Sequence, residues 1–308
     1  MKPFRFGVNL RSAGSREEWA AKARRVEALG YAVLSVPDHL AAMLAPLPAL
    51  VAAADATRHL RVATAVLNND FRHPVVLARE AATVDVLTGG RLQLGLGAGH
   101  MKAEYDQAGL TFDPGPTRIE RLAEAVAIIT GLLSGEPLTY TGRHYRVSGH
   151  TIHPRPVQIP HPPIFIGGNA PPLLALAARQ ADIVGLTGIA FRRGGTAPDV
   201  SGWRAARVDK QVRLVREAAG ERFDALELNA LIQRVVVTDD RRRAAQELAQ
   251  RWTQLSVEDV LTTPFLLIGT VEQMAEDLCA RRERWGLSYH LVHEEALEAL
   301  APVVARLA

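Results

Sequence analysis

Side chains that can transfer protons recur where predicted strands of this chain end. Asp38 and His39 follow a short apolar run, and His100 follows a run rich in leucine and glycine. If these strands are parallel members of one β/α barrel, their carboxyl ends open on the same face and the three side chains converge there. Histidine titrates near neutral pH and a carboxylate can accept a proton, so this set predicts acid–base chemistry.

The same residue types could also ligate a metal ion, because imidazole nitrogens and carboxylate oxygens are common ligands. The sequence contains neither an H-x-H nor an H-E-x-x-H motif, and its single cysteine, Cys279, excludes a cysteine-rich site. We therefore expect no metal. His73, His153 and His161 each precede a proline in a predicted loop, and we expect them to be structural.

The run 87–100, LTGGRLQLGLGAGH, has a pattern that packing alone does not require. Three leucines alternate with Gln93, Gly95 and Gly97, so a strand here would carry leucine on one face and mostly glycine on the other. Several glycines in one strand indicate that another backbone or a flat ligand comes close. We interpret this strand as one whose carboxyl end is kept open for a cofactor ring, and a close contact between a helix and this strand is the alternative.

A second glycine pair precedes a predicted helix. Gly167, Gly168 and Asn169 stand between the apolar run 164–166 and a segment that begins with two prolines, which suit a first helical turn. Unpaired N–H groups and the positive end of a helix dipole can hold a phosphate at such a turn. A tight turn from strand to helix needs the same glycines, so this pattern alone does not decide between binding and packing.

Apolar runs alternate with amphipathic segments along the chain, which is typical of parallel strands joined by right-handed crossovers. The eight expected strands are 4–10, 32–36, 60–67, 92–97, 164–166, 181–187, 226–238 and 289–292. The expected helices are 15–29, 47–57, 75–87, 118–133, one that begins near 171, 208–220, 241–255, 257–262, 271–285 and 294–307. The pattern predicts an α/β fold, a single (β/α)8 TIM barrel that spans residues 1–308.

Three segments interrupt the alternation and are expected to be insertions on the barrel rim: 102–118, 135–163 and 188–202. The second contains a possible hairpin, LTYTGRHYRV. The third lacks periodicity and follows a barrel strand, which predicts a mobile lid whose Arg192 and Arg193 pair with an anionic cofactor tail. A surface loop with two solvated arginines is the alternative.

Composition excludes several classes of function. The 308 residues include 36 Lys and Arg against 33 Asp and Glu, and these charges are scattered, which argues against a nucleic-acid partner. No run of about 18 apolar residues could span a membrane, and the chain begins without an apolar signal core. We expect a soluble, cytoplasmic homodimer that acts on a small-molecule substrate.

These motifs resemble those of the bacterial luciferase-like flavin and deazaflavin oxidoreductases. The resemblance extends over nearly the whole chain and is most specific at 60–100, LRVATAVLNNDFRHPVVLAREAATVDVLTGGRLQLGLGAGH. SVPDHL at 35–40 is similar to the Asp-His element of members that use coenzyme F420, a deazaflavin, and IFIGGN at 164–169 is similar to the glycine pair that holds the cofactor phosphate. The resemblance implies a luciferase-like barrel that binds F420, with FMN as the alternative cofactor.

Carried over to this chain, the resemblance implies a site at the carboxyl ends of the strands. His39 would be the main proton donor or acceptor, and Asp38 and His100 would complete the catalytic set. The cofactor would lie against Ala65, Val66, Asn68, Gly97, Gly99, Gly167, Gly168 and Asn169. The peptide bond between Ala65 and Val66 occupies the place where the family often has a non-prolyl cis bond behind the ring.

The resulting expectation is an oxidoreductase that moves a hydride between F420 and a small organic substrate. An FMN-dependent monooxygenase on the same barrel is one alternative, and a non-catalytic flavin-binding protein is the other. The retained Asp38, His39 and His100 argue against the non-catalytic reading. Deazaflavin sugar-phosphate dehydrogenases of this fold carry a glutamate where this chain has His100, so that particular activity does not follow from the resemblance.

Overall fold

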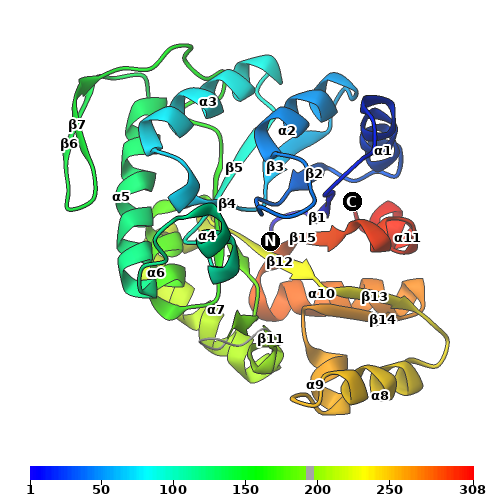
Figure 1. Ribbon diagram of the computed structural model, residues 1–308. Coiled ribbons are helices and arrows are strands. Elements are labelled where there is room, and N and C mark those ends of the chain that lie inside the picture. Colours follow the sequence, from blue (N-terminus) through cyan, green and yellow to red (C-terminus); the bar gives the residue numbers. More distant parts are fainter. Residues whose placement is uncertain (192–197) are drawn as a thin grey trace. The chain divides into compact units, whose positions relative to one another are not determined.

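The computed structural model describes residues 1–191 and 198–308. Within these residues the main sheet has the strand order β3, β2, β1, β15, β12, β9, β8, β5, β4, where β4 is the short strand Leu67–Asn68. Because β3 also pairs with β5, the sheet returns to its first strand. The fold is the (β/α)8 barrel that the sequence predicts. Its strands are β1 (Arg5–Asn9), β2 (Val33–Val36), β3 (Arg61–Thr64), β5 (Leu92–Gly97), β8 (Ile164–Gly168), β9 (Ile183–Leu186), β12 (Glu227–Ile232) and β15 (Leu287–His293) (Figure 1).

Helices follow these strands in the predicted alternation. They are α1 (Arg16–Ala28), α2 (Pro46–Asp55), α3 (Pro74–Leu87), α5 (Gly115–Leu133), α6 (Pro171–Gln180), α7 (Ala205–Ala219), α10 (Val271–Trp285) and α11 (Leu297–Leu307). Smaller elements stand between them: β4 (Leu67–Asn68), α4 (Lys102–Ala108), β6 (Leu138–Thr141), β7 (Arg146–His150), β10 (Ala190–Phe191), β11 (Pro198–Asp199), β13 (Arg234–Val237), α8 (Arg241–Arg251), α9 (Val257–Thr262) and β14 (Leu266–Gly269). No helix among residues 1–191 and 198–308 has the length and apolar character needed to cross a membrane.

The chain divides into two compact units. The first comprises residues 1–9, 26–33 and 167–308, and the second comprises 10–25 and 34–166. Asp38, His39 and His100 therefore belong to the second unit, whereas the segment 167–169 belongs to the first.

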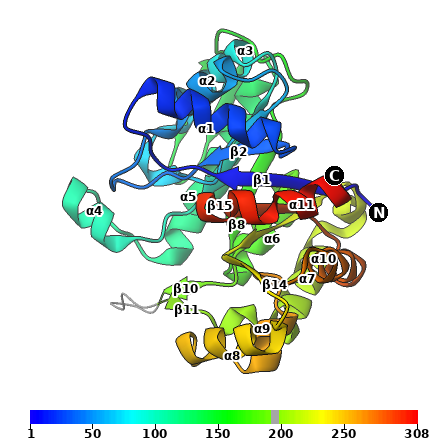
Figure 2. The ribbon, with the colours of Figure 1, turned by 90° about the vertical axis from the view of Figure 1, so that its right-hand side faces the viewer.

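In the first unit, β1 and β15 run parallel and lie side by side, with Phe6 opposite His290 and Asn9 opposite His293 (Figure 2). β12 continues this sheet, because it pairs in parallel with both β15 and β9. Every residue of β9 is buried, as expected for a parallel strand covered on both faces.

The expectation of one long strand over 226–238 is wrong. The chain forms two strands here, because β12 ends at Ile232 and β13 pairs with β14 in a separate parallel sheet. The backbone N–H of Gln233 donates to the carbonyl of Phe265 at 2.8 Å, so the strand changes partner at this residue. β14 was not expected from the sequence, since its short apolar run carries no periodicity of its own.

The rim insertions contain more regular structure than the sequence indicates. The hairpin expected within 135–163 is confirmed as β6 and β7, which pair antiparallel. The segment 102–118 was expected to be irregular, but it contains α4, which ends at Gly109 with a positive φ of 70°. In 188–202, β10 and β11 pair antiparallel, and Arg192 and Arg193 lie outside the described residues.

The glycine-rich strand β5 is explained at Gly95 by the backbone of its neighbour β3. A Cβ at Gly95 would stand 1.9 Å from the carbonyl oxygen of Thr64, which no side chain tolerates. The Thr64 hydroxyl also accepts from the Gly95 N–H at 2.7 Å and donates to the Gly95 carbonyl at 2.9 Å. A close backbone, one of the two causes that the glycine pattern indicates, therefore accounts for Gly95, and a carboxyl end of β5 kept open for a cofactor ring stays a prediction.

Replacing Gly95 with alanine is expected to lower the free energy of unfolding by about 3 kcal/mol, because the new methyl group must displace the Thr64 backbone. Gly115→Ala is the matched control, since the nearest atom to its Cβ lies 4.0 Å away at the end of the Arg118 side chain. It should change stability by about 0.5 kcal/mol or less. Urea denaturation of both variants measures this, and equal losses would contradict the packing account.

Candidate active site

His39 and Glu104 form the central contact of the second unit's polar cluster. His39 follows β2, and its Nδ1 lies 3.0 and 3.2 Å from the two carboxylate oxygens of Glu104. Glu104 stands on α4 and is only 6% exposed, whereas the His39 side chain is 27% exposed. A carboxylate can only accept hydrogen bonds, so Nδ1 carries the proton of this contact. The pairing leaves Nε2 as the nitrogen that can exchange a proton with another group.

His100 lies against His39 at the end of β5. The two imidazole rings meet edge to face, with their centroids 5.4 Å apart. Surrounding protein, the neighbouring His39 and the charge of Arg118 lower the pKa of His100 to about 4. The His100 side chain is also exposed to water, which screens these charges. At neutral pH His100 is an uncharged imidazole, which is a hydrogen-bond donor and acceptor.

Asp38 is bound through both carboxylate oxygens. Arg72 donates to Oδ2 at 2.6 Å and to Oδ1 at 3.2 Å, and the Asn68 N–H donates to Oδ2 at 3.0 Å. The Asp38 side chain is 4% exposed and that of Arg72 is 22% exposed. These bonds join the loop after β2 to the loop after β4. Asp38 therefore holds these loops together, and its catalytic role stays a prediction.

A second set of polar side chains supports the same loops. The Tyr105 hydroxyl lies 2.9 Å from Asn68 Oδ1 and 2.9 Å from Asp70 Oδ2. Burial raises the pKa of Tyr105 to about 12, so the hydroxyl keeps its proton and can donate. Arg121 completes the set by donating to Asp70 Oδ1 at 2.9 Å. Because Tyr105 follows Glu104 on α4, this set also fixes the helix that carries the partner of His39.

Arg118 binds the backbone of the loop that carries His100. Its Nη1 donates to the carbonyls of Ala98, at 2.9 Å, and Gly99. Gly99 has a positive φ of 73°, and a Cβ there would stand 2.1 Å from the Tyr105 hydroxyl and 2.7 Å from Asn68 Oδ1. Glycine is thus required at position 99 by its backbone conformation and by protein neighbours.

The predicted cofactor-binding residues of the second unit lie close together. The peptide bond between Ala65 and Val66 is cis, as the resemblance implied. Asn68 lies opposite Gly97 in the parallel pairing of β4 with β5. The structure therefore brings together Asn68, Gly97 and Gly99 beside the histidine pair.

The predicted phosphate-binding turn belongs to the first unit. Gly168 ends β8, and a Cβ there would stand 2.2 Å from the end of the Leu173 side chain, so a side chain at this position would displace Leu173 of α6. The side-chain amide of Gln211 on α7 donates to Asn169 Oδ1. No side chain caps α6 at Ala170, its first two residues are prolines without an N–H, and the N–H groups of Leu173 and Leu174 both donate to the Ala170 carbonyl at 3.0 Å.

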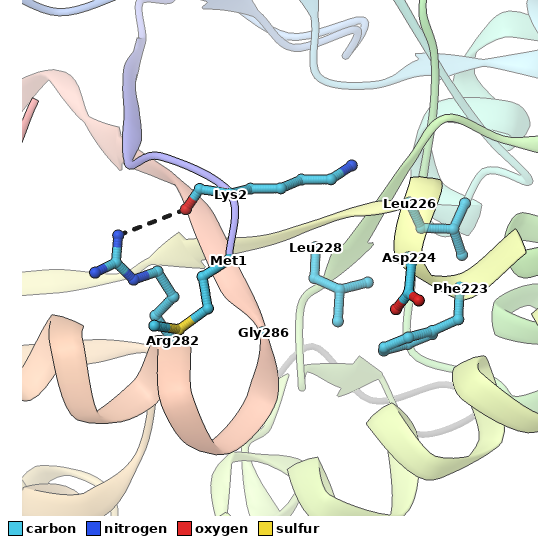
Figure 3. Close-up of a pocket in the computed structure, with 8 residues that line it drawn as sticks. All are labelled: Met1, Lys2, Phe223, Asp224, Leu226, Leu228, Arg282 and Gly286. Atoms are coloured by element: carbon cyan, nitrogen blue, oxygen red, sulfur yellow. Dashed lines mark hydrogen bonds between the residues drawn. The ribbon is translucent and has the colours of Figure 1, made fainter.

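A pocket of the first unit lies away from the carboxyl ends of the strands. It is lined by residues that precede or begin β1, β12 and β15, namely Met1, Lys2, Phe223, Asp224, Leu226, Leu228, Arg282 and Gly286 (Figure 3). These are the amino-terminal ends, where barrel residues serve stability and catalysis is not found. The dashed bond in Figure 3 joins Arg282 to the Lys2 carbonyl and ties the chain start to α10.

Sequence reasoning missed Glu104, Arg72 and Tyr105. Glu104 and Tyr105 stand in a seven-residue helix, too short for an apolar stripe to reveal it. The available signals were Gly109, a typical helix stop, and the Lys102–Asp106 pair at helical spacing, whose atoms lie 2.6 Å apart. Arg72 lies in a polar loop, where nothing in the sequence pattern indicates that it binds Asp38.

Comparison with known proteins finds one fold and relatives that are named for two different cofactors. The family described as luciferase-like monooxygenase matches residues 1–257. An F420-dependent glucose-6-phosphate dehydrogenase of Nakamurella multipartita is 31% identical over 268 residues, covering 83% of this chain and 74% of that protein. The enzyme of the same name from Microbacterium testaceum is 38% identical over 164 residues, which span 51% of this chain and only 48% of that protein.

An FMNH2-dependent dimethylsulfone monooxygenase of Pseudomonas putida is 32% identical over 127 residues, covering 41% of this chain and 35% of that protein. Among solved structures, the coenzyme F420-dependent tetrahydromethanopterin reductase of Methanopyrus kandleri superposes with a TM-score of 0.78 over 100% of both chains. Its sequence identity is 18%, so this likeness shows the fold alone.

Replacing Arg72 with methionine is expected to lower the free energy of unfolding by about 3 kcal/mol, because it leaves the buried Asp38 carboxylate without its cation. Arg243→Met is the control, since Arg243 pairs with Glu247 on an exposed helix face, and it should cost about 0.5 kcal/mol or less. Chemical denaturation at pH 7 measures both. A loss of less than about 1 kcal/mol for Arg72→Met would show that the pair does not hold the loops.

Proposed function

Because the chain belongs to the luciferase-like monooxygenase family, which matches residues 1–257, we propose that this oxidoreductase transfers a hydride between coenzyme F420 and a small organic substrate. The observation that carries the proposal is the pair of His39 and Glu104 beside a neutral His100. The names of the two dehydrogenase relatives support F420 as the cofactor.

The proposed reaction needs a proton acceptor, because oxidation of an alcohol releases a proton together with the hydride. His39 supplies one, since Glu104 binds the Nδ1 proton and leaves Nε2 to accept the proton of a substrate hydroxyl. When Nε2 is protonated, the imidazolium faces the carboxylate of Glu104, which stabilises the charge. In the reverse direction the same nitrogen returns the proton to a carbonyl oxygen.

The chemistry of the donor set fits a deazaflavin. F420, when bound, supplies the carbon that accepts or gives the hydride. The residues of the second unit that would hold its ring are Asn68, Gly97 and the Ala65–Val66 segment. Asp38 supports this set indirectly, because it fixes the Asn68 backbone.

His100 distinguishes this chain from the sugar-phosphate dehydrogenases that it resembles. A neutral imidazole can donate a hydrogen bond to a substrate oxygen without adding charge, whereas a glutamate there would accept one. We propose that His100 orients the substrate oxygen toward Nε2 of His39. The edge-to-face contact of the two rings, whose centroids lie 5.4 Å apart, supports this role.

The second candidate is an FMN-dependent monooxygenase, and the relative from Pseudomonas putida favours it. The two candidates differ in their use of oxygen. An F420 enzyme works without oxygen, whereas a reduced-FMN monooxygenase consumes it. A panel of small alcohols with oxidised F420 under nitrogen tests the first activity, and oxygen uptake with reduced FMN tests the second.

His39→Ala is expected to lower the rate of F420 reduction by about 100-fold, because the proton acceptor is lost, while the cofactor dissociation constant stays within about tenfold. Stopped-flow spectroscopy of the deazaflavin absorbance measures the rate. An active His39→Ala enzyme with an unchanged pH profile would remove His39 from the mechanism.

Glu104→Gln tests the orienting contact separately. The rate is expected to fall about tenfold, because a neutral amide binds the Nδ1 proton of His39 less strongly than a carboxylate does and orients the imidazole less firmly. Asp106→Asn is the control, because Asp106 stands on the same helix and pairs only with the exposed Lys102 in the bonds described. Equal effects of the two substitutions would contradict a specific role for Glu104.

A further inference from the structure

A polar cluster lies on the outer face of β15, far along the chain from the histidine pair. Arg281 stands in the buried stripe of α10, between Leu278 and Trp285, where an apolar side chain is the usual occupant. Ser288 and His290 alternate with Tyr289 along β15, so they share one face of the strand. α10 packs against β15, and both elements belong to the first unit.

The nitrogen and oxygen atoms of this cluster are buried without hydrogen-bond partners. Arg281 is 5% exposed, Ser288 is 1% exposed and His290 is fully buried. Within the part of the chain that the structure describes, Nη1 of Arg281, Oγ of Ser288 and both ring nitrogens of His290 have no partner. Buried polar atoms are nearly always satisfied, so these atoms indicate an occupant of complementary chemistry.

The charges of the cluster do not cancel. Asp277 lies 3.5 Å from Arg281 and 2.6 Å from Arg241, so a single carboxylate serves two guanidinium groups. Burial lowers the pKa of Arg281 only to about 10, which leaves it charged at neutral pH. Burial and the charge of Arg281 lower the pKa of His290 to about 3, while a contact with the Leu287 backbone acts in the opposite direction. The result is one net positive charge beside a neutral imidazole.

We propose that Arg281, Ser288 and His290 form a buried binding site for chloride between α10 and β15. The three side chains offer a guanidinium N–H, a hydroxyl and an imidazole N–H, which are donors suited to an anion. An enclosed anion must lose its water shell, and this penalty rises steeply with charge, which favours a monovalent halide over phosphate or sulfate. Phe4 and Phe6, whose rings lie 6.1 and 5.9 Å from that of His290, form the apolar wall.

The site is independent of the proposed cofactor chemistry and would act on stability. An anion that binds only the folded chain stabilises it in proportion to its concentration over its dissociation constant. The unfolding temperature is therefore expected to rise by about 2 °C or more when chloride replaces gluconate at ~0.15 M and equal ionic strength. Bromide should act like chloride.

Arg281→Met removes the cation while keeping an unbranched side chain, and it should abolish the halide response. Arg243→Met is the control, because that side chain is 76% exposed and should leave the response intact. Equal unfolding temperatures of the native protein in chloride and gluconate would overturn the proposal, and so would a full response in Arg281→Met. If Arg281→Met does not fold, anomalous diffraction from native crystals in bromide decides: a bromine peak at Arg281 and His290 supports the site, and water alone there overturns it.

Discussion

Thr64 and Gly95 approach so closely that no side chain fits between them, and the geometry of the candidate site depends on this approach. The Thr64 side chain exchanges two hydrogen bonds with the Gly95 backbone, at the point where β3 ends. The chain resumes as β4 and places Asn68 opposite Gly97. From there the Asn68 N–H reaches Asp38, and the loop after β2 is fixed with His39 next to it.

Electrostatic pairing then decides which groups remain for chemistry. Asp38 is bound by Arg72 and Asp70 by Arg121, so these carboxylates hold structure. Glu104 instead faces a histidine, which can give up its proton at the other ring nitrogen. An arginine partner is always charged, whereas a histidine partner can gain or lose a proton. Asp38 and Asp70 therefore support the loops, and Glu104 serves the proposed reaction.

The sequence predicts the barrel well because its alternation of apolar runs and amphipathic helices repeats along the whole chain. It also places His39 and His100 at strand ends, and the structure brings their rings together. It does not reveal Glu104, because the helix that carries it has too few residues for a periodic pattern. The glycines of β5 indicate a close backbone or a bound ring without telling the two apart, and only the distance at Gly95 shows that a backbone lies there.

The break after β12 was missed for a related reason. The residues from Leu226 to Thr238 favour extended structure throughout, and a change of strand partner at Gln233 depends on the carbonyl of Phe265, which is distant in sequence.

The central claim concerns the cofactor, and calorimetric titration of the apo-protein with F420 and with FMN tests it most directly. The account predicts micromolar or tighter binding of F420 and weaker binding of FMN. Stoichiometric FMN in the purified protein, with no measurable binding of F420, would contradict it.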